Sequence, residues 1–202
     1  AASDVYKRQS QEDGFAEHLS TRGDNLPLVA NFLFEHHPDA FARILEAMKA
    51  RVPGVSLVEP RQTEDGRLVL RFQDGSFKDP FVARHVSDGT IKMFAYLVLL
   101  NDPQPYPLLA VEEPENQLYP ELLPELAEEF RSYAQRGGQV FISSHSPDFL
   151  NALKLEEIYC LRKVQGFTQI SRAAESANLQ ALVDAGDLPG ALWKQGLLEG
   201  LN

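Results

Sequence analysis

The hydrophobic positions in the first part of the chain predict two short helices. Asp24-Asn25-Leu26-Pro27 is typical of a helix start, and a second helix is expected to begin at Pro38-Asp39 and to end at Pro53-Gly54. Each helix carries one apolar stripe at helical spacing, which predicts a face turned toward a core. The stripes consist of Leu28, Val29, Phe32 and Leu33 in the first helix, and of Phe41, Ile44, Leu45 and Met48 in the second.

Two strands are predicted directly after these helices, over residues 56–59 and 67–72, around a turn at Asp65-Gly66. In the second strand apolar residues alternate with arginines, which is the pattern of a strand with one buried face. The region should therefore form a small antiparallel sheet. The alternating residues are Leu68, Leu70 and Phe72 against Arg67 and Arg71.

From Ser87 onward the pattern changes to that of a parallel α/β sheet. A nearly all-apolar helix is expected from Ser87 to Leu100, followed by strand, helix, strand, helix and strand. The first of these strands, within residues 107–113, is an apolar run that ends in two adjacent glutamates, and the second, at 140–142, ends in Ser143-Ser144-His145. Both are expected to be buried. A helix over about residues 120–135 should cover the sheet.

The last part of the chain predicts a closing hairpin and an irregular helical tail. The hairpin strands are expected at 157–161 and 167–170, and the tail from Leu179 to Leu198 has helical spacing without recognisable chemistry. The expected division of the chain is a tail over 1–9, a helical hairpin with a small antiparallel lobe over 10–85, an α/β core over 86–163, and a carboxy-terminal hairpin with helices over 164–202.

Composition narrows the class of protein. With 202 residues, 44% of them hydrophobic, the chain can bury a sizeable core. The formal net charge of −10 argues against a nucleic-acid-binding surface by charge alone. The single cysteine, Cys160, allows neither a disulfide framework nor a cysteine-based metal cage, and we expect a cytoplasmic protein. No apolar run approaches the roughly 18 residues that span a membrane, so no membrane partner is expected.

Polar side chains at the ends of the predicted strands indicate a phosphate site. Ligands of open α/β sheets bind outside the carboxyl ends of the strands, so Glu112, Glu113 and His145 are expected to meet there. Phosphoryl transfer needs an oxygen ligand for Mg²⁺, a carboxylate that activates water, and a donor to the phosphate. We assign these roles to Glu112, Glu113 and His145 in that order. Ser87 and the amides near Gly89, at a helix amino terminus, suit an anionic phosphate.

In this order, the motifs resemble those of the ABC-type ATPase head of predicted AAA-family ATPases, which are related to recombination and chromosome-maintenance proteins. The resemblance covers Leu26 to Leu153. It implies an α/β fold of the P-loop NTPase type, a parallel sheet with flanking helices, joined to the small helical and antiparallel lobe. The matching segments are 86–92 for the signature motif, 108–113 for Walker B with its catalytic glutamate, 115–120 for the D-loop and 141–147 for the histidine switch.

The resemblance also implies activity, cofactors and partners. The activity would be ATP hydrolysis with ATP and Mg²⁺ as cofactors, Glu112 at the metal, and Glu113 and His145 in catalysis. Ser87 and Gly89 would contact the γ-phosphate of ATP held by a partner subunit, which implies a homodimer joined through its nucleotide sites. DNA or an effector protein would bind through other parts of such an ATPase.

Three departures from the family pattern stand out. Glu112 occupies a position where aspartate is common, and Tyr119 one where histidine or aspartate is common, so Tyr119 is given no role. No Gly-x-x-x-x-Gly-Lys-Ser/Thr motif occurs among the thirteen glycines, so the phosphate-cradling loop is missing. Asp4 to Gln9 also resembles a translated sequencing adapter. We therefore expect an ATPase truncated at its amino terminus and nearly inactive alone; an ordinary disordered tail is the alternative for residues 1–9.

Two other functions remain open. The chain could be a non-catalytic ATPase half that regulates or completes the site of a partner subunit and contributes only Ser87 and Gly89. A metal-dependent nuclease could use carboxylates and a histidine at the same strand ends, although the sequence lacks an aspartate-rich strand end and a basic groove. The residues of that alternative are Glu112, Glu113, Glu115 and His145.

Overall fold

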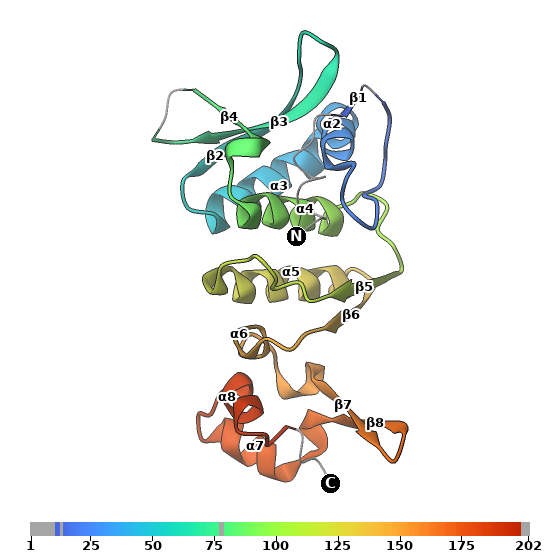
Figure 1. Ribbon diagram of the computed structural model, residues 1–202, viewed down its shortest axis with the longest axis vertical. Coiled ribbons are helices and arrows are strands. Elements are labelled where there is room, and N and C mark those ends of the chain that lie inside the picture. The colour runs from blue at the N-terminus through green and yellow to red at the C-terminus, as the bar shows by residue number, and fades with distance from the viewer. Residues whose placement is uncertain (1–10, 13, 77–78, 199–202) are drawn as a thin grey trace. The chain divides into compact units, whose positions relative to one another are not determined.

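The computed structural model describes residues 11–12, 14–76 and 79–198 (Figure 1). These residues fall into two compact units. The amino-terminal unit takes its described residues from 1–109 and 129–140, and the carboxy-terminal unit takes them from 110–128 and 141–202. The tail predicted over residues 1–9 lies outside the described residues. Within the described chain, no helix is both long and apolar enough to cross a lipid bilayer.

The two predicted helices at the start of the amino-terminal unit are confirmed as α2 (Leu26–His36) and α3 (Pro38–Arg51). Both have a proline in the first turn, where a missing backbone donor is tolerated. Their buried faces match the predicted stripes in part, because Leu28, Phe32 and Leu45 are only half-buried. The buried side chains are Leu26, Pro27, Val29, Ala30 and Leu33 in α2, and Ala40, Phe41, Ile44 and Met48 in α3.

The predicted antiparallel pair is confirmed as β2 (Val55–Gln62) and β3 (Arg67–Asp74). The apolar alternation in β3 also holds, since Leu68, Leu70 and Phe72 are buried. Two further strands, β1 (Gln11–Glu12) and β4 (Phe81–Val82), pair with β3. They were not predicted, because two residues are too few to establish a period.

Helix α4 (Asp88–Leu100) begins where the sequence predicts, with Ser87 as its N-cap. The Ser87 side chain accepts a hydrogen bond from the backbone N–H of Thr90. Such a cap satisfies one of the donors that a helix start leaves open. Most of α4 is buried, and Phe94 packs edge-on against Phe72 of β3 with ring centroids 5.9 Å apart.

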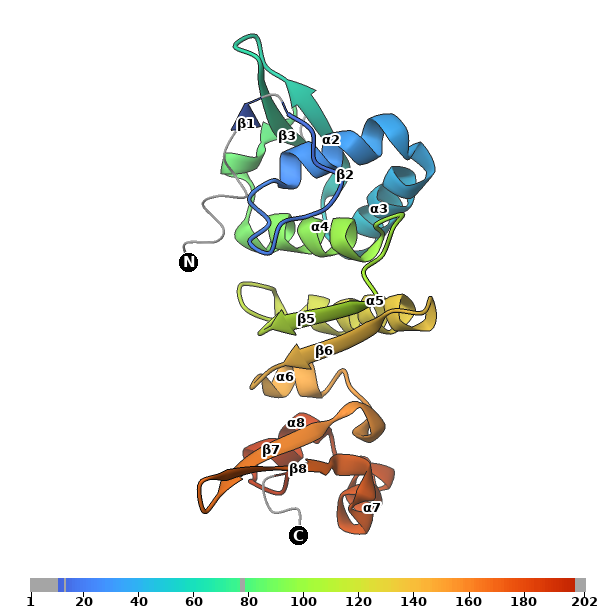
Figure 2. The ribbon, with the colours of Figure 1, turned by 90° about the vertical axis from the view of Figure 1, so that its right-hand side faces the viewer.

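The predicted parallel sheet is formed by β5 (Leu108–Glu112) and β6 (Gln139–Ser143), which a 3-10 turn, η2 (Pro120–Leu122), and helix α5 (Leu123–Gln135) connect. Near the start of the pair Gln139 N–H donates to Pro107 O, and at its end Glu113 N–H donates to Ser143 O. The start of β5 thus lies beside the start of β6, and the end of β5 lies beside the end of β6, so the strands are parallel. Figure 2 shows the two arrows pointing the same way.

The expectation that these strands are buried is wrong. Leu108 is 53% exposed and Phe141 is 58% exposed, and every second residue of each strand is open to solvent. Leu109 is the only residue of β5 and β6 that is fully buried. Parallel sheets are usually covered on both faces. In this two-stranded sheet only one face is covered, so the apolar run produces half-buried strands.

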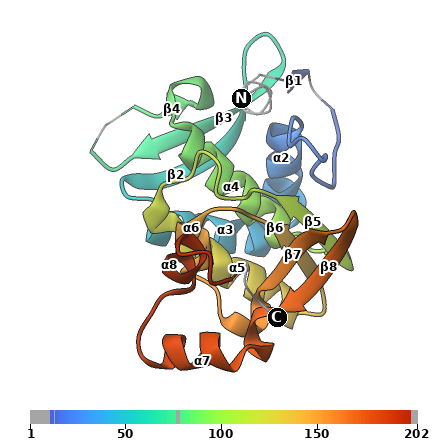
Figure 3. The same ribbon diagram turned by 60° about the horizontal axis from the view of Figure 1, so that its bottom comes forward.

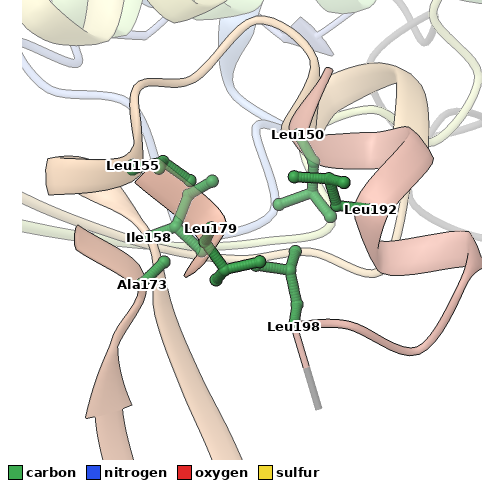
Figure 4. Close-up of a cluster of buried hydrophobic side chains, with 7 residues drawn as sticks. All are labelled: Leu150, Leu155, Ile158, Ala173, Leu179, Leu192 and Leu198. Atoms are coloured by element: carbon green, nitrogen blue, oxygen red, sulfur yellow. The ribbon is translucent and has the colours of Figure 1, made fainter. Parts of the chain in front are cut away.

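The carboxy-terminal unit continues with α6 (Pro147–Leu150), η3 (Leu155–Glu157), β7 (Tyr159–Val164), β8 (Phe167–Arg172), η4 (Ala173–Glu175), α7 (Ala177–Asp184) and α8 (Pro189–Lys194). The predicted hairpin is confirmed as β7 and β8, which lie side by side (Figure 3). In the described residues β7 pairs with β8 and does not extend the parallel sheet. A separate apolar cluster supports this unit (Figure 4): Leu150, Leu155, Ile158, Ala173, Leu179, Leu192 and Leu198.

Gly138 is packed against a buried aromatic ring, and we expect Gly138→Ala to destabilise the protein. A Cβ at this position would lie 2.3 Å from Cε1 of Tyr133. The ring cannot yield, because Tyr133 is 1% exposed and its hydroxyl donates to the backbone oxygen of Tyr106. Overpacking of this kind lowers the free energy of unfolding by about 1–3 kcal/mol. Urea denaturation measures the loss, and an unchanged midpoint would contradict the packing.

Because of Tyr133, we also expect the folded protein to lose stability in alkaline solution. Burial, with a smaller contribution from the nearby Asp102 carboxylate, raises the pKa of Tyr133 above its usual value of 10.0. The neutral phenol is favoured in the folded state, so its contribution is complete below about pH 10 and is lost as the pH rises through the folded-state pKa. The urea midpoint should fall more steeply above pH 10 in the wild type than in Tyr133→Phe. Equal slopes would show that Tyr133 is not responsible.

Candidate functional site

The carboxyl end of the β5–β6 sheet carries the predicted catalytic residues. Glu112 is the last residue of β5, and Glu113 follows it with a backbone φ of 45°. This left-handed conformation is unfavourable for a residue with a side chain and persists only where its surroundings enforce it. Here the hydrogen bond from Glu113 N–H to Ser143 O, 2.8 Å long, fixes the turn. Strained positions of this kind are concentrated at functional sites.

The structure brings Glu113 and His145 together. Oε1 of Glu113 lies 2.9 Å from Nδ1 of His145. The other carboxylate oxygen, Oε2, accepts a hydrogen bond of 2.6 Å from the Asn116 amide. The His145 side chain is 69% exposed and that of Glu113 is 35% exposed, so both can reach a ligand in solvent.

A second contact joins the same two loops. The Ser144 hydroxyl donates to Oε1 of Glu115 at 2.6 Å and accepts from the backbone N–H of Ser146 at 3.1 Å. The Ser146 side chain in turn caps α6 by accepting from Phe149 N–H. The loop that carries His145 is therefore held on both sides of the histidine.

Glu112 is exposed at the end of β5. Among the described residues, no three or more His, Cys, Asp or Glu side chains are grouped so that they could hold a metal. The described residues thus form no metal cage made of protein ligands alone. Mg²⁺ at nucleotide sites is usually held by one or two carboxylates together with phosphate and water. The single exposed carboxylate of Glu112 fits that mode of binding.

The two remaining predicted residues belong to the amino-terminal unit, at the start of α4. The Ser87 hydroxyl lies 2.7 Å from Oγ1 of Thr90, besides capping the helix. Ser87 is exposed, whereas Gly89 is buried in the first helical turn. The cap explains why a serine is favourable here, and a role in phosphate binding stays a prediction. Glu112, Glu113 and His145 belong to the other unit.

The contacts of Asn116 and Ser144 were not predicted. Asn116 reaches Glu113 because its backbone N–H closes a turn onto Glu113 O at 3.2 Å, which places the two side chains on one side. Ser144 reaches Glu115 across the ends of two strands. The only sequence signals were a small polar residue beside the histidine and an amide three positions after the glutamate.

The family described as "AAA domain, putative AbiEii toxin, Type IV TA system" matches residues 3–151. A search of the curated proteins gives no match.

Solved structures with a similar fold include ATPase heads of SMC proteins. One, from a study of ATP-driven dimerization and DNA-stimulated activation of SMC ATPases, has a TM-score of 0.55 at 13% identity and covers 78% of this chain and 98% of the other. An SMC head bound to the C-winged helix domain of ScpA has a TM-score of 0.59 at 12% identity and covers 85% of this chain and 53% of the other.

A third structure is the SMC head with an extended coiled coil from Pyrococcus furiosus, bound to the C-terminal domain of ScpA. Its TM-score is 0.56 at 12% identity, with 77% of this chain and 40% of the other covered. The chain thus spans about half or less of the longer SMC structures. The shared fold confirms the predicted α/β ATPase-head class.

Proposed function

This chain belongs to the AAA-domain family that matches residues 3–151, and on that basis we propose that it takes part in ATP binding and hydrolysis as one half of an ATPase head. The proposal rests on one observation, the contact of 2.9 Å between Glu113 and His145 at the carboxyl end of two parallel strands. Ligand sites of open α/β sheets lie at this end.

Glu113 and His145 are chemically suited to the two tasks that the protein must perform on the γ-phosphate. A carboxylate orients and polarises the attacking water, and a ring N–H hydrogen-bonds to the phosphate as its charge develops. The Glu113 carboxylate can only accept, so Nδ1 of His145 donates to it, and Nε2 donates to the phosphate when the ring carries a proton on both nitrogens. The strained turn at Glu113 holds the carboxylate in place before a substrate arrives.

Mg²⁺ would be held by Glu112, together with oxygens of the nucleotide. The ion would neutralise charge on the phosphates during transfer. Ser87 and the amides at the start of α4 would contact the γ-phosphate of ATP on a second subunit, in a homodimer joined through its nucleotide sites. Contacts with DNA or an effector protein would come from other parts of the assembly, and the site of action would be the cytoplasm.

The proposal requires a phosphate-cradling loop from another polypeptide segment, since the 202 residues contain no Gly-x-x-x-x-Gly-Lys-Ser/Thr motif. Reading the gene upstream of the codon for Ser10 tests this requirement. An in-frame strand followed by that motif is the expected result, and the longer protein should then hydrolyse ATP. A start codon near Ser10 with no such motif before it would contradict hydrolysis within one chain.

The missing motif also favours a second candidate, a non-catalytic half that completes a partner's site through Ser87 and Gly89 alone. In that case the partner supplies every reacting group. Glu113 would then have no effect on turnover, which separates the two candidates.

A further inference from the structure

We propose that Glu115 is a positioning residue for His145, acting through the Ser144 hydroxyl. The inference rests on the proposed role of His145 and adds to it a residue that does not itself touch the nucleotide. Glu115 stands two positions after Glu113, so one short segment holds the histidine loop in two places. Glu113 contacts the ring of His145, and Glu115 contacts the residue before it.

The Ser144 hydroxyl connects Glu115 to the backbone that follows His145. A serine hydroxyl has one proton, and that of Ser144 is donated to Glu115. Its lone pairs are then directed elsewhere, and one of them accepts from Ser146 N–H at 3.1 Å. Glu115 thereby determines how the hydroxyl is oriented, and the hydroxyl fixes the amide that follows the histidine.

The segment that carries both glutamates is rigid enough to act as one support. Pro114 lies between them, is buried, and has a backbone φ fixed by its ring. Glu113 N–H donates to Ser143 O at 2.8 Å, which joins this segment to the end of β6. The positions of Ser143, Ser144 and His145 are therefore all set by residues 113–115.

The second oxygen of Glu115 shows that stability alone does not explain a glutamate here. Oε2 is buried and has no hydrogen-bond partner in the described part of the chain. A buried acceptor without a partner is unfavourable. The carboxylate does provide a charged acceptor for Ser144, and a bond to a charged acceptor is shorter and stronger than one to a neutral group. This stronger bond suits a residue whose role is to hold the Ser144 hydroxyl in one orientation.

Amide hydrogen exchange at Ser146, followed by NMR on the chain itself, tests the contact without any activity. Glu115→Ala should speed the exchange of the Ser146 amide about five- to tenfold, as expected for the loss of one hydrogen bond. Glu115→Gln keeps an acceptor oxygen and should retain most of the protection. Glu121→Ala, which removes an exposed carboxylate from η2, is the matched control and should change nothing.

Unchanged exchange at Ser146 in a folded Glu115→Ala protein would overturn the proposal. If that variant does not fold, Ser144→Ala tests the same contact, and it too should speed the exchange at Ser146. The Glu113 amide serves as an internal reference, because its bond to Ser143 O does not depend on Glu115.

Turnover separates positioning from a general structural role. In an ATP-hydrolysing assembly, Glu115→Ala should lower kcat about tenfold and leave KM for ATP unchanged, since the nucleotide is not contacted. Ser144→Ala should have the same effect, the double variant should lose no more, and Ser144→Thr should restore the rate. A raised KM with unchanged kcat would overturn the proposal. An assembly without any hydrolysis would contradict the proposed function, while exchange at Ser146 still decides whether Glu115 holds the loop.

Discussion

Gly190→Ala is expected to destabilise the carboxy-terminal unit severely. Gly190 lies in the first turn of α8, where its N–H donates to Oδ1 of Asn151 at 2.8 Å. An added Cβ would lie 2.0 Å from the backbone oxygen of Pro147 and 2.6 Å from that same Oδ1. A backbone carbonyl cannot rotate away as a flexible side chain can. Relief therefore requires α8 to separate from α6, with a loss of about 3 kcal/mol or more in the free energy of unfolding.

Urea denaturation followed by circular dichroism measures this loss. Lys194→Ala changes an exposed residue of the same helix and should shift the stability by no more than about 0.5 kcal/mol. If Gly190→Ala unfolds at the wild-type midpoint, the close approach of α8 to α6 does not exist in solution. A large effect would show that the carboxy-terminal helices support the helix directly after the histidine loop.

Glu113→Gln is expected to lower ATP turnover by about 10²- to 10⁴-fold in an assembly that supplies the phosphate-cradling loop. Glutamine has nearly the same size and can still accept from Asn116, so the turn should keep its shape. It carries no charge and is a much weaker base, so it cannot activate water as the carboxylate does. ATP binding should persist, because the change affects the attacking water and not the nucleotide.

Steady-state hydrolysis together with equilibrium ATP binding checks this result. Glu121→Gln removes an exposed carboxylate outside the site and should leave both quantities unchanged. Unaltered turnover in Glu113→Gln would support the non-catalytic half, in which this chain supplies only Ser87 and Gly89. Loss of ATP binding together with turnover would point to a structural role for Glu113.

The sequence predicted elements where the signal was local. Start signals that contain proline marked α2 and α3, and the period of the apolar residues gave the buried faces of these helices and of β3. The exposure of β5 and β6 could not be predicted, because it depends on how many strands a sheet contains. That number follows from contacts distant in the sequence. The two-residue strands β1 and β4 were missed because so short a segment has no period.

For the site, the prediction that acids and a histidine follow parallel strands was enough to place Glu113 beside His145. That inference used the general rule that the carboxyl ends of parallel strands lie at the same edge of the sheet. The roles of these residues stay predictions. The contacts of Asn116 and Ser144 required the turn at Glu113, whose φ of 45° no sequence pattern indicated. Side-chain networks of this kind depend on backbone conformation more than on residue type.

The open face of the β5–β6 sheet determines how the purified chain should behave at high concentration. Leu108 and Phe141 are exposed on it, and each of the two strands has one edge without a partner in the described residues. Leu161 and Ile170, paired across the β7–β8 hairpin, add a further exposed apolar pair. Such edges and faces act as templates for other chains. Self-association and precipitation should therefore increase with concentration, and a sample prepared for spectroscopy will need to be dilute.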